Sequence, residues 1–394
     1  MAKNLTGPVK TAKYILRDYQ QKAVGCAIVY FENGKDSGLM VLPTGSGKSL
    51  VIAEIAKKLN GHVLVFQPTK EILEQNYEKY LSYGGLAGIY SASIGVKEIC
   101  PVTFATIGSV FRKPDLFSHF QYIIIDECHG VNAKNGMYKT FLNNIGDKKL
   151  LGLTATPYRL NTDGYGGSML KFLTRTRPRI FKELIYYSQI SDLAEKGYLA
   201  KIDYYPIKSM DATKLQLNST GADYTDKSVI EHYKAINLSS QLLNVTQRLM
   251  KKRDSILVFT RFVEEATKLV EKIGSNAEIV TAITPKKERQ SIIERFRSGK
   301  TNVVANVGVL TVGFDYPELS TVLLARPTRS LALYYQMIGR AIRPHKTKDS
   351  AWVIDMGDSY RRFGKIEDLR LTCSKPKLWH IESNNRQLTN VYYY

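Results

Sequence analysis

The segment from Leu42 to Ser49, Leu-Pro-Thr-Gly-Ser-Gly-Lys-Ser, constrains the fold of this chain more than any other segment. It follows a short apolar run at residues 38–42 and precedes a helical pattern at residues 50–59. Glycines in such a turn let consecutive backbone N–H groups converge on one anion, and the next helix adds the positive end of its dipole. A strand, a phosphate-binding loop and a helix in this order predict an α/β fold that binds a nucleotide.

The end of this loop predicts how a nucleotide is held. The amine of Lys48 can reach the β- and γ-phosphates, and the hydroxyl of Ser49 can bind Mg²⁺. Leu42 replaces the first glycine of the general phosphate-loop pattern, so the match is to a narrower form of that pattern. The sequence therefore predicts a site for ATP and Mg²⁺ whose loop residues are Thr44, Gly45, Ser46, Gly47, Lys48 and Ser49.

Two adjacent carboxylates, Asp126 and Glu127, follow the β-branched run at residues 122–125. Such a run is typical of a buried strand in a parallel sheet, and ligands bind at the carboxyl ends of these strands. We expect Asp126 to hold Mg²⁺ and Glu127 to orient and deprotonate an attacking water. An acidic pair on the surface is the alternative, but the upstream phosphate loop makes hydrolysis the better interpretation.

Apolar runs and helical patterns alternate along the chain, and this order predicts parallel, doubly wound sheets in two similar halves. Amphipathic patterns at residues 70–81, 263–273 and 286–297 predict helices between the strands. The two halves share this pattern without a repeat of residues. The expected strands are residues 38–42, 62–66, 102–105, 122–125 and 150–153 in the first half, and 255–259, 302–305, 321–325 and 351–354 in the second.

The charge of the chain favours an anionic partner. Lys and Arg number 56 against 36 Asp and Glu, a net charge of +20, which favours nucleic acid or an anionic membrane surface. No apolar run reaches the ~18 residues that could span a membrane, and the N-terminus lacks the apolar core of a secretory signal. The four cysteines form neither a disulfide framework nor a zinc motif. We expect a cytoplasmic protein of a bacterial or phage-infected cell.

Two basic stretches allow more than one interpretation. Residues 161–221 carry several arginines around Pro178, and could be a mobile loop on a nucleic-acid backbone or a solvated linker. The stretch after Met356 is also basic and ends in Tyr392-Tyr393-Tyr394. It could contact phosphates, or its aromatic side chains could pack and close the fold.

Further motifs complete a pattern that resembles one family. They are Leu16-Arg17-Asp18-Tyr19-Gln20-Gln21, Phe66-Gln67-Pro68-Thr69, Ala105-Thr106, Thr154-Ala155-Thr156-Pro157, Asn306 to Asp315, and Gln336-Met337-Ile338-Gly339-Arg340-Ala341-Ile342-Arg343. With the phosphate loop and Asp126-Glu127-Cys128-His129, they resemble superfamily 2 DExH-box helicases, most like RadD-type DNA repair ATPases and related phage helicases. The resemblance covers about residues 14–360. It implies two tandem RecA-like domains with the ATP site in the cleft between them.

The expected domain limits are residues 1–185 for the first RecA-like domain, 186–360 for the second and 361–394 for a basic tail. In the first domain the resemblance implies that Arg17 stacks on adenine and that Gln20 hydrogen-bonds its edge, which suits an amide that both donates and accepts. It implies that Thr69 and Thr106 bind the nucleic-acid backbone, although capping a helix is the alternative for both.

In the second domain the resemblance implies that Thr311 contacts nucleic acid, while Gly313 and Asp315 approach the γ-phosphate and the ribose. Arg340 and Arg343 lie three residues apart, so we expect them on one helical face, pointing at the phosphates. Arg340 would contact the γ-phosphate and Arg343 would be the arginine finger. The expected catalytic residues are Lys48, Asp126, Glu127, Gln336, Arg340 and Arg343.

The expected activity is ATP hydrolysis that drives movement along DNA, or its remodelling, in replication, recombination or repair. The Asp-Glu-Cys-His and Thr-Ala-Thr motifs, with Gln336, resemble DNA-directed members more than RNA-directed ones. Three alternatives stay open: a motor subunit of a larger nuclease or recombination complex, an RNA helicase, and a nucleotide-gated binding protein without turnover. The presence of Glu127 and Arg343 speaks against the last.

Overall fold

The computed structural model describes residues 14–162, 167–311, 314 and 316–393. The chain forms two compact units, and its C-terminal stretch contributes to both. The first unit comprises Met1–Arg159, Leu170–Gln189 and Leu371–Ile381, and the second comprises Leu160–Met169, Ile190–Arg370 and Glu382–Tyr394.

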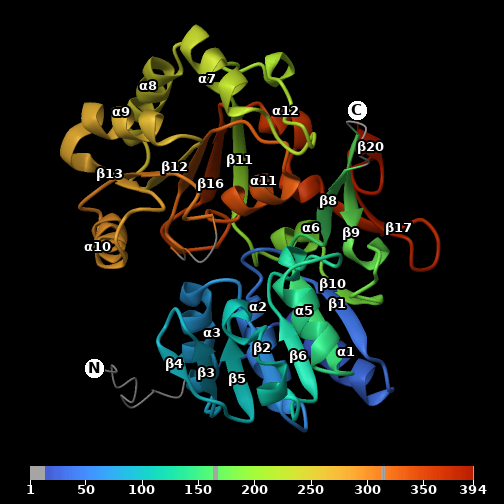
Figure 1. The fold of residues 1–394 in the computed structure, drawn as a ribbon. Coiled ribbons are helices and arrows are strands. Elements are labelled where there is room, and N and C mark those ends of the chain that lie inside the picture. The colour runs from blue at the N-terminus through green and yellow to red at the C-terminus, as the bar shows by residue number, and fades with distance from the viewer. Residues whose placement is uncertain (1–13, 163–166, 312–313, 315, 394) are drawn as a thin grey trace. The chain divides into compact units, whose positions relative to one another are not determined.

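A mainly parallel sheet forms the centre of the first unit, as the alternating pattern predicted. Its strand order among the described residues is β10-β1-β7-β6-β2-β5-β3-β4, and only β3 and β4 pair antiparallel (Figure 1). The middle strands are buried on both faces, which explains why they read as continuous apolar runs. The strands are β1 Ser37–Val41, β2 Val63–Phe66, β3 Gly88–Ser91, β4 Val96–Lys97, β5 Val102–Ala105, β6 Tyr122–Ile125, β7 Lys149–Thr154 and β10 Glu183–Tyr187.

The helices of this unit connect the strands and begin near the strands' carboxyl ends. Helix α2 packs against both α1 and α3, and it begins directly after the left-handed Gly47. The α-helices are α1 Asp18–Glu32, α2 Lys48–Lys58, α3 Lys70–Ser82, α4 Ile107–Val110 and α5 Met137–Asn144. Short 3₁₀ turns occur at η1 Pro114–Phe117, η2 Cys128–Gly130 and η3 Leu173–Arg175.

The second unit has its own parallel sheet, with the order β11-β16-β15-β12-β14-β13 among the described residues (Figure 1). Its strands are β11 Lys201–Pro206, β12 Ile256–Thr260, β13 Ala277–Val280, β14 Val303–Asn306, β15 Thr321–Ala325 and β16 Ser350–Asp355. Its helices are α6 Ile190–Glu195, α7 Asp226–Ala235, α8 Leu238–Met250, α9 Val263–Ile273, α10 Lys286–Arg297, α11 Leu331–Ile338 and α12 Ser359–Phe363, with η4 Ala212–Lys214, η5 Gly274–Asn276 and η6 Ile366–Asp368.

The predicted strands are confirmed, with limits that differ by one residue at most. The interpretation of residues 161–221 as a loop or linker is wrong, because this stretch contains β10, β11 and α6. Two small sheets complete the fold. They consist of β17 Arg370–Cys373, β18 Trp379–Ser383 and β19 Arg386–Gln387, and of β8 Tyr158–Thr162, β9 Ser168–Phe172 and β20 Tyr392–Tyr393.

The structure favours the interpretation in which aromatic residues of the C-terminal stretch pack against the fold. The ring of Trp379 lies 5.2 Å from that of Tyr187 in an edge-to-face arrangement. The side-chain amide of Gln189 accepts a hydrogen bond from the Leu371 N–H and donates one to the Leu371 carbonyl. These contacts attach residues of the C-terminal stretch to the end of β10. Within the described part of the chain, no helix is long and apolar enough to cross a membrane.

Candidate active site

The phosphate loop lies between the end of β1 and the start of α2. Gly45 and Gly47 both have φ of +79°, a conformation that other residues adopt only with strain. A Cβ atom at Gly47 would also lie 2.6 Å from Nε2 of Gln20, so the hydrogen-bonded amide of Gln20 would have to move. These two glycines shape the loop so that its N–H groups can face an anion.

Helix α1 holds this loop in place. The Ser46 carbonyl accepts hydrogen bonds from the Tyr19 hydroxyl (2.5 Å) and from Nε2 of Gln20 (2.8 Å). Oε1 of Gln20 accepts from the backbone N–H of Arg17, the N-cap of α1. The amide of Gln20 therefore both donates and accepts here, although its contacts are to the protein backbone. The roles of Arg17 and Gln20 toward adenine stay predictions.

The predicted carboxylates lie at the carboxyl end of β6. Asp126 is 5% exposed, and its oxygens accept from the Asn76 amide (3.2 Å) and from the Glu127 N–H (2.9 Å). Glu127 adopts a left-handed backbone with φ of +47°, an uncommon conformation for glutamate. Glu127 is the N-cap of η2, so this conformation lies where the chain passes from β6 into that turn.

Glu127 is the centre of a polar cluster. Its Oε1 lies 3.2 Å from Nζ of Lys48, and its Oε2 lies 3.3 Å from Nδ1 of His129. The same His129 nitrogen lies 2.9 Å from the Thr154 hydroxyl, which in turn accepts from the Thr156 N–H at 3.0 Å. The strand order β1-β7-β6 brings these residues together, because all three strands end at one edge.

The two carboxylates are in different electrostatic states. Burial, and then the charge of Glu127, raise the pKa of Asp126 to about 7. Burial favours the neutral form of Glu127 and by itself would raise its pKa. Lys48 and His129 outweigh this effect and lower the pKa of this carboxyl. Glu127 is thus a carboxylate at neutral pH, and Asp126 is a buried acid that a nearby cation would stabilise as its anion.

These residues fit a magnesium nucleotide. The Ser46 hydroxyl is buried without a hydrogen-bond partner among the described residues, which leaves it available to a ligand. Ser49 and Asp126 offer the hard oxygen atoms that Mg²⁺ prefers. Within the described residues no group of three His, Cys, Asp or Glu side chains could hold a metal. The two oxygen donors of Ser49 and Asp126 suit an ion that keeps waters and phosphates as its other ligands.

Sequence reasoning missed several residues that shape this site. Tyr19, Asn76 and His129 contact the predicted residues directly. Gln67 lies beside Asp126, because β2 and β6 pair in register and the Asp126 N–H donates to the Phe66 carbonyl. Both side-chain polar atoms of Gln67 are buried without partners in the described residues. Its place directly before Pro68-Thr69 was the available sequence signal.

The predicted nucleic-acid contacts of the first unit lie at helix starts. Thr69 is the N-cap of α3, and its hydroxyl accepts from the Ile72 N–H at 3.3 Å. The Thr106 hydroxyl, before α4, instead contacts the hydroxyls of Ser91 (3.1 Å) and Ser109 (2.9 Å). The capping alternative therefore holds for Thr69, and phosphate binding by either residue stays a prediction.

The arginine motif of the second unit departs from the expected geometry. Gln336 is in α11, but this helix ends at Ile338, so Arg340 and Arg343 do not share a helical face as predicted. Gly339 follows at the C-cap, and the chain turns there. Arg340 donates instead to the carbonyls of Phe314 (2.7 Å) and Gln336 (3.3 Å). Thr311 is 9% exposed, while Gly313 and Asp315 lie outside the described residues.

Two family models match the chain. The model described as type III restriction enzyme, res subunit, matches residues 13–159, and the helicase conserved C-terminal domain matches residues 235–345. Among solved structures, a fragment of a putative HsdR subunit of a type I restriction enzyme from Vibrio vulnificus is similar with a TM-score of 0.67 and 22% identity, over 90% of this chain and 67% of that one. The DNA-bound type ISP restriction-modification enzyme LlaBIII is similar with a TM-score of 0.64 and 18% identity, over 87% of this chain and 28% of that one.

Curated relatives point the same way. The chain is 29% identical to a 51.5 kDa protein of a Lactococcus phage, over 79% of this chain and 64% of that protein. It is 27% identical to the putative ATP-dependent helicase IRC3 of Saccharomyces cerevisiae, over 86% of this chain and 51% of that protein. It is 25% identical to the DNA 3'-5' translocase XPB2 of Sulfurisphaera tokodaii, over 86% of this chain and 81% of that protein. The chain spans about half to two thirds of the first two relatives. The narrower likeness to RadD-type ATPases stays a prediction, whereas the matched models and relatives show that this chain belongs to superfamily 2 of the helicases.

Proposed function

We propose that this protein hydrolyses ATP to translocate on DNA or to remodel it. The observation that carries the proposal is the cluster in which Lys48 and His129 hold Glu127 as a carboxylate beside the buried Asp126. Magnesium ATP would supply the phosphoanhydride bond and the charge neutralisation for its cleavage. Glu127 then orients and deprotonates the attacking water, and Lys48 holds the β- and γ-phosphates.

In this proposal Gln336, Arg340 and Arg343 of the second unit complete the catalytic set, with Arg343 acting on the γ-phosphate. Thr154 is the first residue of the Thr-Ala-Thr segment. Its hydroxyl contacts His129, the partner of Glu127, and accepts from the Thr156 N–H. Loss of the γ-phosphate would therefore change contacts that reach this segment. DNA is the proposed track because XPB2, a relative, is described as a DNA translocase. The four free cysteines suit a reducing cytoplasm.

The test is the steady-state ATPase rate with single-stranded, double-stranded and forked DNA and with RNA. We expect stimulation by DNA above that by RNA. Glu127→Gln should keep ATP binding and lose turnover, because an amide cannot accept the proton of the water. Lys48→Ala should lose nucleotide affinity as well. Normal turnover by Glu127→Gln, or equal rates with every nucleic acid, would contradict the proposal.

A second candidate is the motor subunit of a larger nuclease complex. The match of residues 13–159 to the restriction-enzyme model favours it. The two candidates differ in what the isolated chain does. An independent motor has DNA-stimulated ATPase activity alone, whereas a subunit needs its assembly for that activity.

A further inference from the structure

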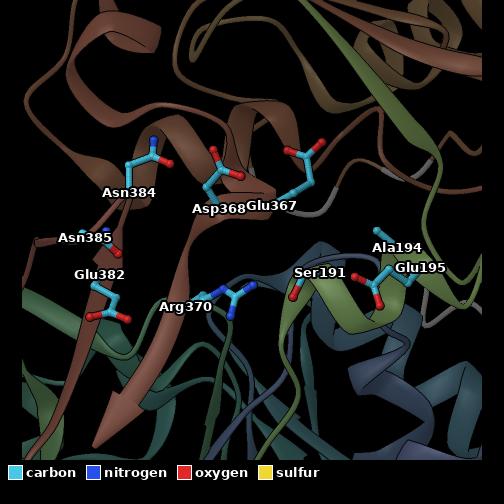
Figure 2. A pocket seen from close by; sticks show the side chains of 9 residues that line it. All are labelled: Ser191, Ala194, Glu195, Glu367, Asp368, Arg370, Glu382, Asn384 and Asn385. Carbon is cyan, nitrogen blue, oxygen red and sulfur yellow. The ribbon is translucent and has the colours of Figure 1, made fainter. Parts of the chain in front are cut away.

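Cavities of opposite charge occur in the second unit. A cavity of about 530 Å³ is bordered by α6 and η6, and its titratable lining is mostly acidic (Figure 2). The carboxylates there are Glu195, Glu367, Asp368 and Glu382, and Arg370 is the cation beside them. A cavity of about 330 Å³ is bordered by η4 and α12 and is lined by Arg329, Arg361 and Arg362, with Asp358 as its carboxylate. A polyanion would be repelled from the first and attracted to the second.

Among the three arginines that line the second cavity, Arg329 is the buried one. Arg329 is 9% exposed, and its Nη1 donates to the Gly221 carbonyl at 2.9 Å. Its backbone N–H donates to Asp223, whose other oxygen lies 3.3 Å from Arg261. Burial, and then the nearby charge of Arg362, lower the pKa of Arg329. A guanidinium in this position is held rigidly and lacks solvent to stabilise its charge.

The carboxylates around the cavity do not neutralise it. Arg361 lies 3.7 Å from Asp358 and 4.0 Å from Asp211, and Asp358 also accepts from the Ala212 N–H. In the part of the chain that the structure describes, no carboxylate forms an ion pair with Arg329 or Arg362. The cavity therefore keeps an excess of positive charge.

From this arrangement we infer that the cavity binds a phosphate group of a nucleic-acid strand. Guanidinium groups offer paired N–H donors that match phosphate oxygens, and Arg329, Arg361 and Arg362 supply three of them. Leu215, Leu217 and Tyr224 give the same cavity an apolar wall for a sugar or base. Its volume is near the lower limit of ligand sites, about 300 Å³, which suits one nucleotide unit.

The choice of nucleic acid as the ligand rests on the proposed function, since a free nucleoside phosphate has the same chemistry. The site has a direct route to the ATPase motif. Arg329 precedes Ser330, whose hydroxyl accepts from the Leu333 N–H and caps α11, the helix that carries Gln336.

The experiment measures binding of a labelled oligo-dT strand across a salt series, for the wild type and three full-length variants. Arg362→Gln should weaken binding about tenfold, the value of a hydrogen bond to a charged group. It should also reduce the slope of log K against log salt by about 0.7, the value for one lost contact to a single strand. Lys251→Gln removes an exposed charge outside the cavity and should match the wild type. Arg329→Lys should lose affinity while circular dichroism shows an intact fold.

A second titration separates the sources of phosphate. Binding of AMP and of inorganic phosphate is measured by calorimetry in Lys48→Ala protein, with and without Arg362→Gln. A loss confined to AMP and phosphate identifies a nucleoside-phosphate site and overturns the strand assignment. Equal strand binding by Arg362→Gln and Lys251→Gln, together with no effect of Arg362→Gln on AMP or phosphate binding, overturns the site itself. If the wild type binds no DNA, the proposed function fails, and the AMP titration still decides whether the cavity binds phosphate.

Discussion

At the scale of single residues, charge placement decides the chemistry. Glu127 and Asp126 are neighbours in sequence, yet Lys48 and His129 form their ion pairs with Glu127, whereas Asp126 accepts from the Asn76 amide. The resulting separation of the two pKa values keeps Glu127 ionised, and it leaves Asp126 to be ionised by a nearby cation. Lys48 is part of the phosphate loop, so one amine both stabilises the base and is placed to hold phosphate.

Arg343→Ala should leave ATP affinity nearly unchanged and lower kcat by about 100-fold or more, since an arginine finger acts on transition-state charge. Lys346→Ala, an exposed charge three residues away, is the matched control. Nucleotide affinity and DNA-stimulated kcat are measured on the same preparation. Wild-type kcat in Arg343→Ala would mean that the second unit does not complete the active site.

Lys348 should make stability depend on pH. Its amine donates to the carbonyls of Leu319 (2.8 Å) and Ala341 (2.7 Å), and burial, then Arg343, lower its pKa to about 8. Below this value the folded protein carries a costly buried charge; as pH rises toward the ordinary lysine pKa, that cost is removed. The free energy of unfolding, relative to Lys348→Met, should rise by up to about 2 kcal/mol between about pH 7.5 and about pH 9.5. Urea titrations measure it, and a constant difference would contradict the assignment.

At the scale of elements, close packing positions the site. Gly152 is on β7 between the strands that carry the phosphate loop and Asp126. A Cβ atom there would lie 2.7 Å from the Cys128 sulfur and would also overlap the Phe181 ring. The absence of a side chain thus lets η2 and Phe181 pack directly on the strand.

Gly152→Ala should lower the free energy of unfolding by about 1–3 kcal/mol, because overpacking forces the strand or its neighbours to move. Gly25→Ala is the control with the opposite sign. Gly25 is on an exposed face of α1, with no atom within 4 Å of an added Cβ, so alanine should stabilise the helix by up to about 1 kcal/mol. Urea unfolding of both variants tests the pair. Equal effects would show that the contacts at Gly152 do not limit packing.

At the scale of the whole molecule, the net charge of +20 dominates interactions with a polyanion. DNA affinity should fall by about one to three orders of magnitude between about 50 and about 200 mM salt, because phosphate contacts release counterions. It should differ little between two oligonucleotides of unrelated sequence, because phosphates carry no base identity. Fluorescence anisotropy measures both. A flat salt dependence would exclude binding through the phosphate backbone.

The sequence by itself determined the phosphate loop, the acidic pair and nine strands of the two large sheets, namely β1, β2, β5, β6, β7, β12, β14, β15 and β16. These are local patterns: a glycine turn before a helix, or an apolar run buried on both faces, has the same appearance in any fold that uses it. The wrong predictions arose where the pattern was weak. Residues 161–221 are rich in polar and basic residues, and two of their strands, β10 and β11, pair at the edges of the two large sheets.

Only the tertiary structure decided how distant residues meet. Lys48, Glu127 and Thr154 are far apart in the chain, and they come together because β1, β7 and β6 are neighbours that end at one edge. The helical face predicted for Arg340 and Arg343 was wrong because α11 ends at Ile338, where the Arg340 side chain turns to backbone carbonyls. Pairing of strands and burial of charge depend on long-range contacts, whereas the loop depends on its own backbone. The sequence therefore identified the chemical groups, and the fold decided which of them lie close enough to interact electrostatically.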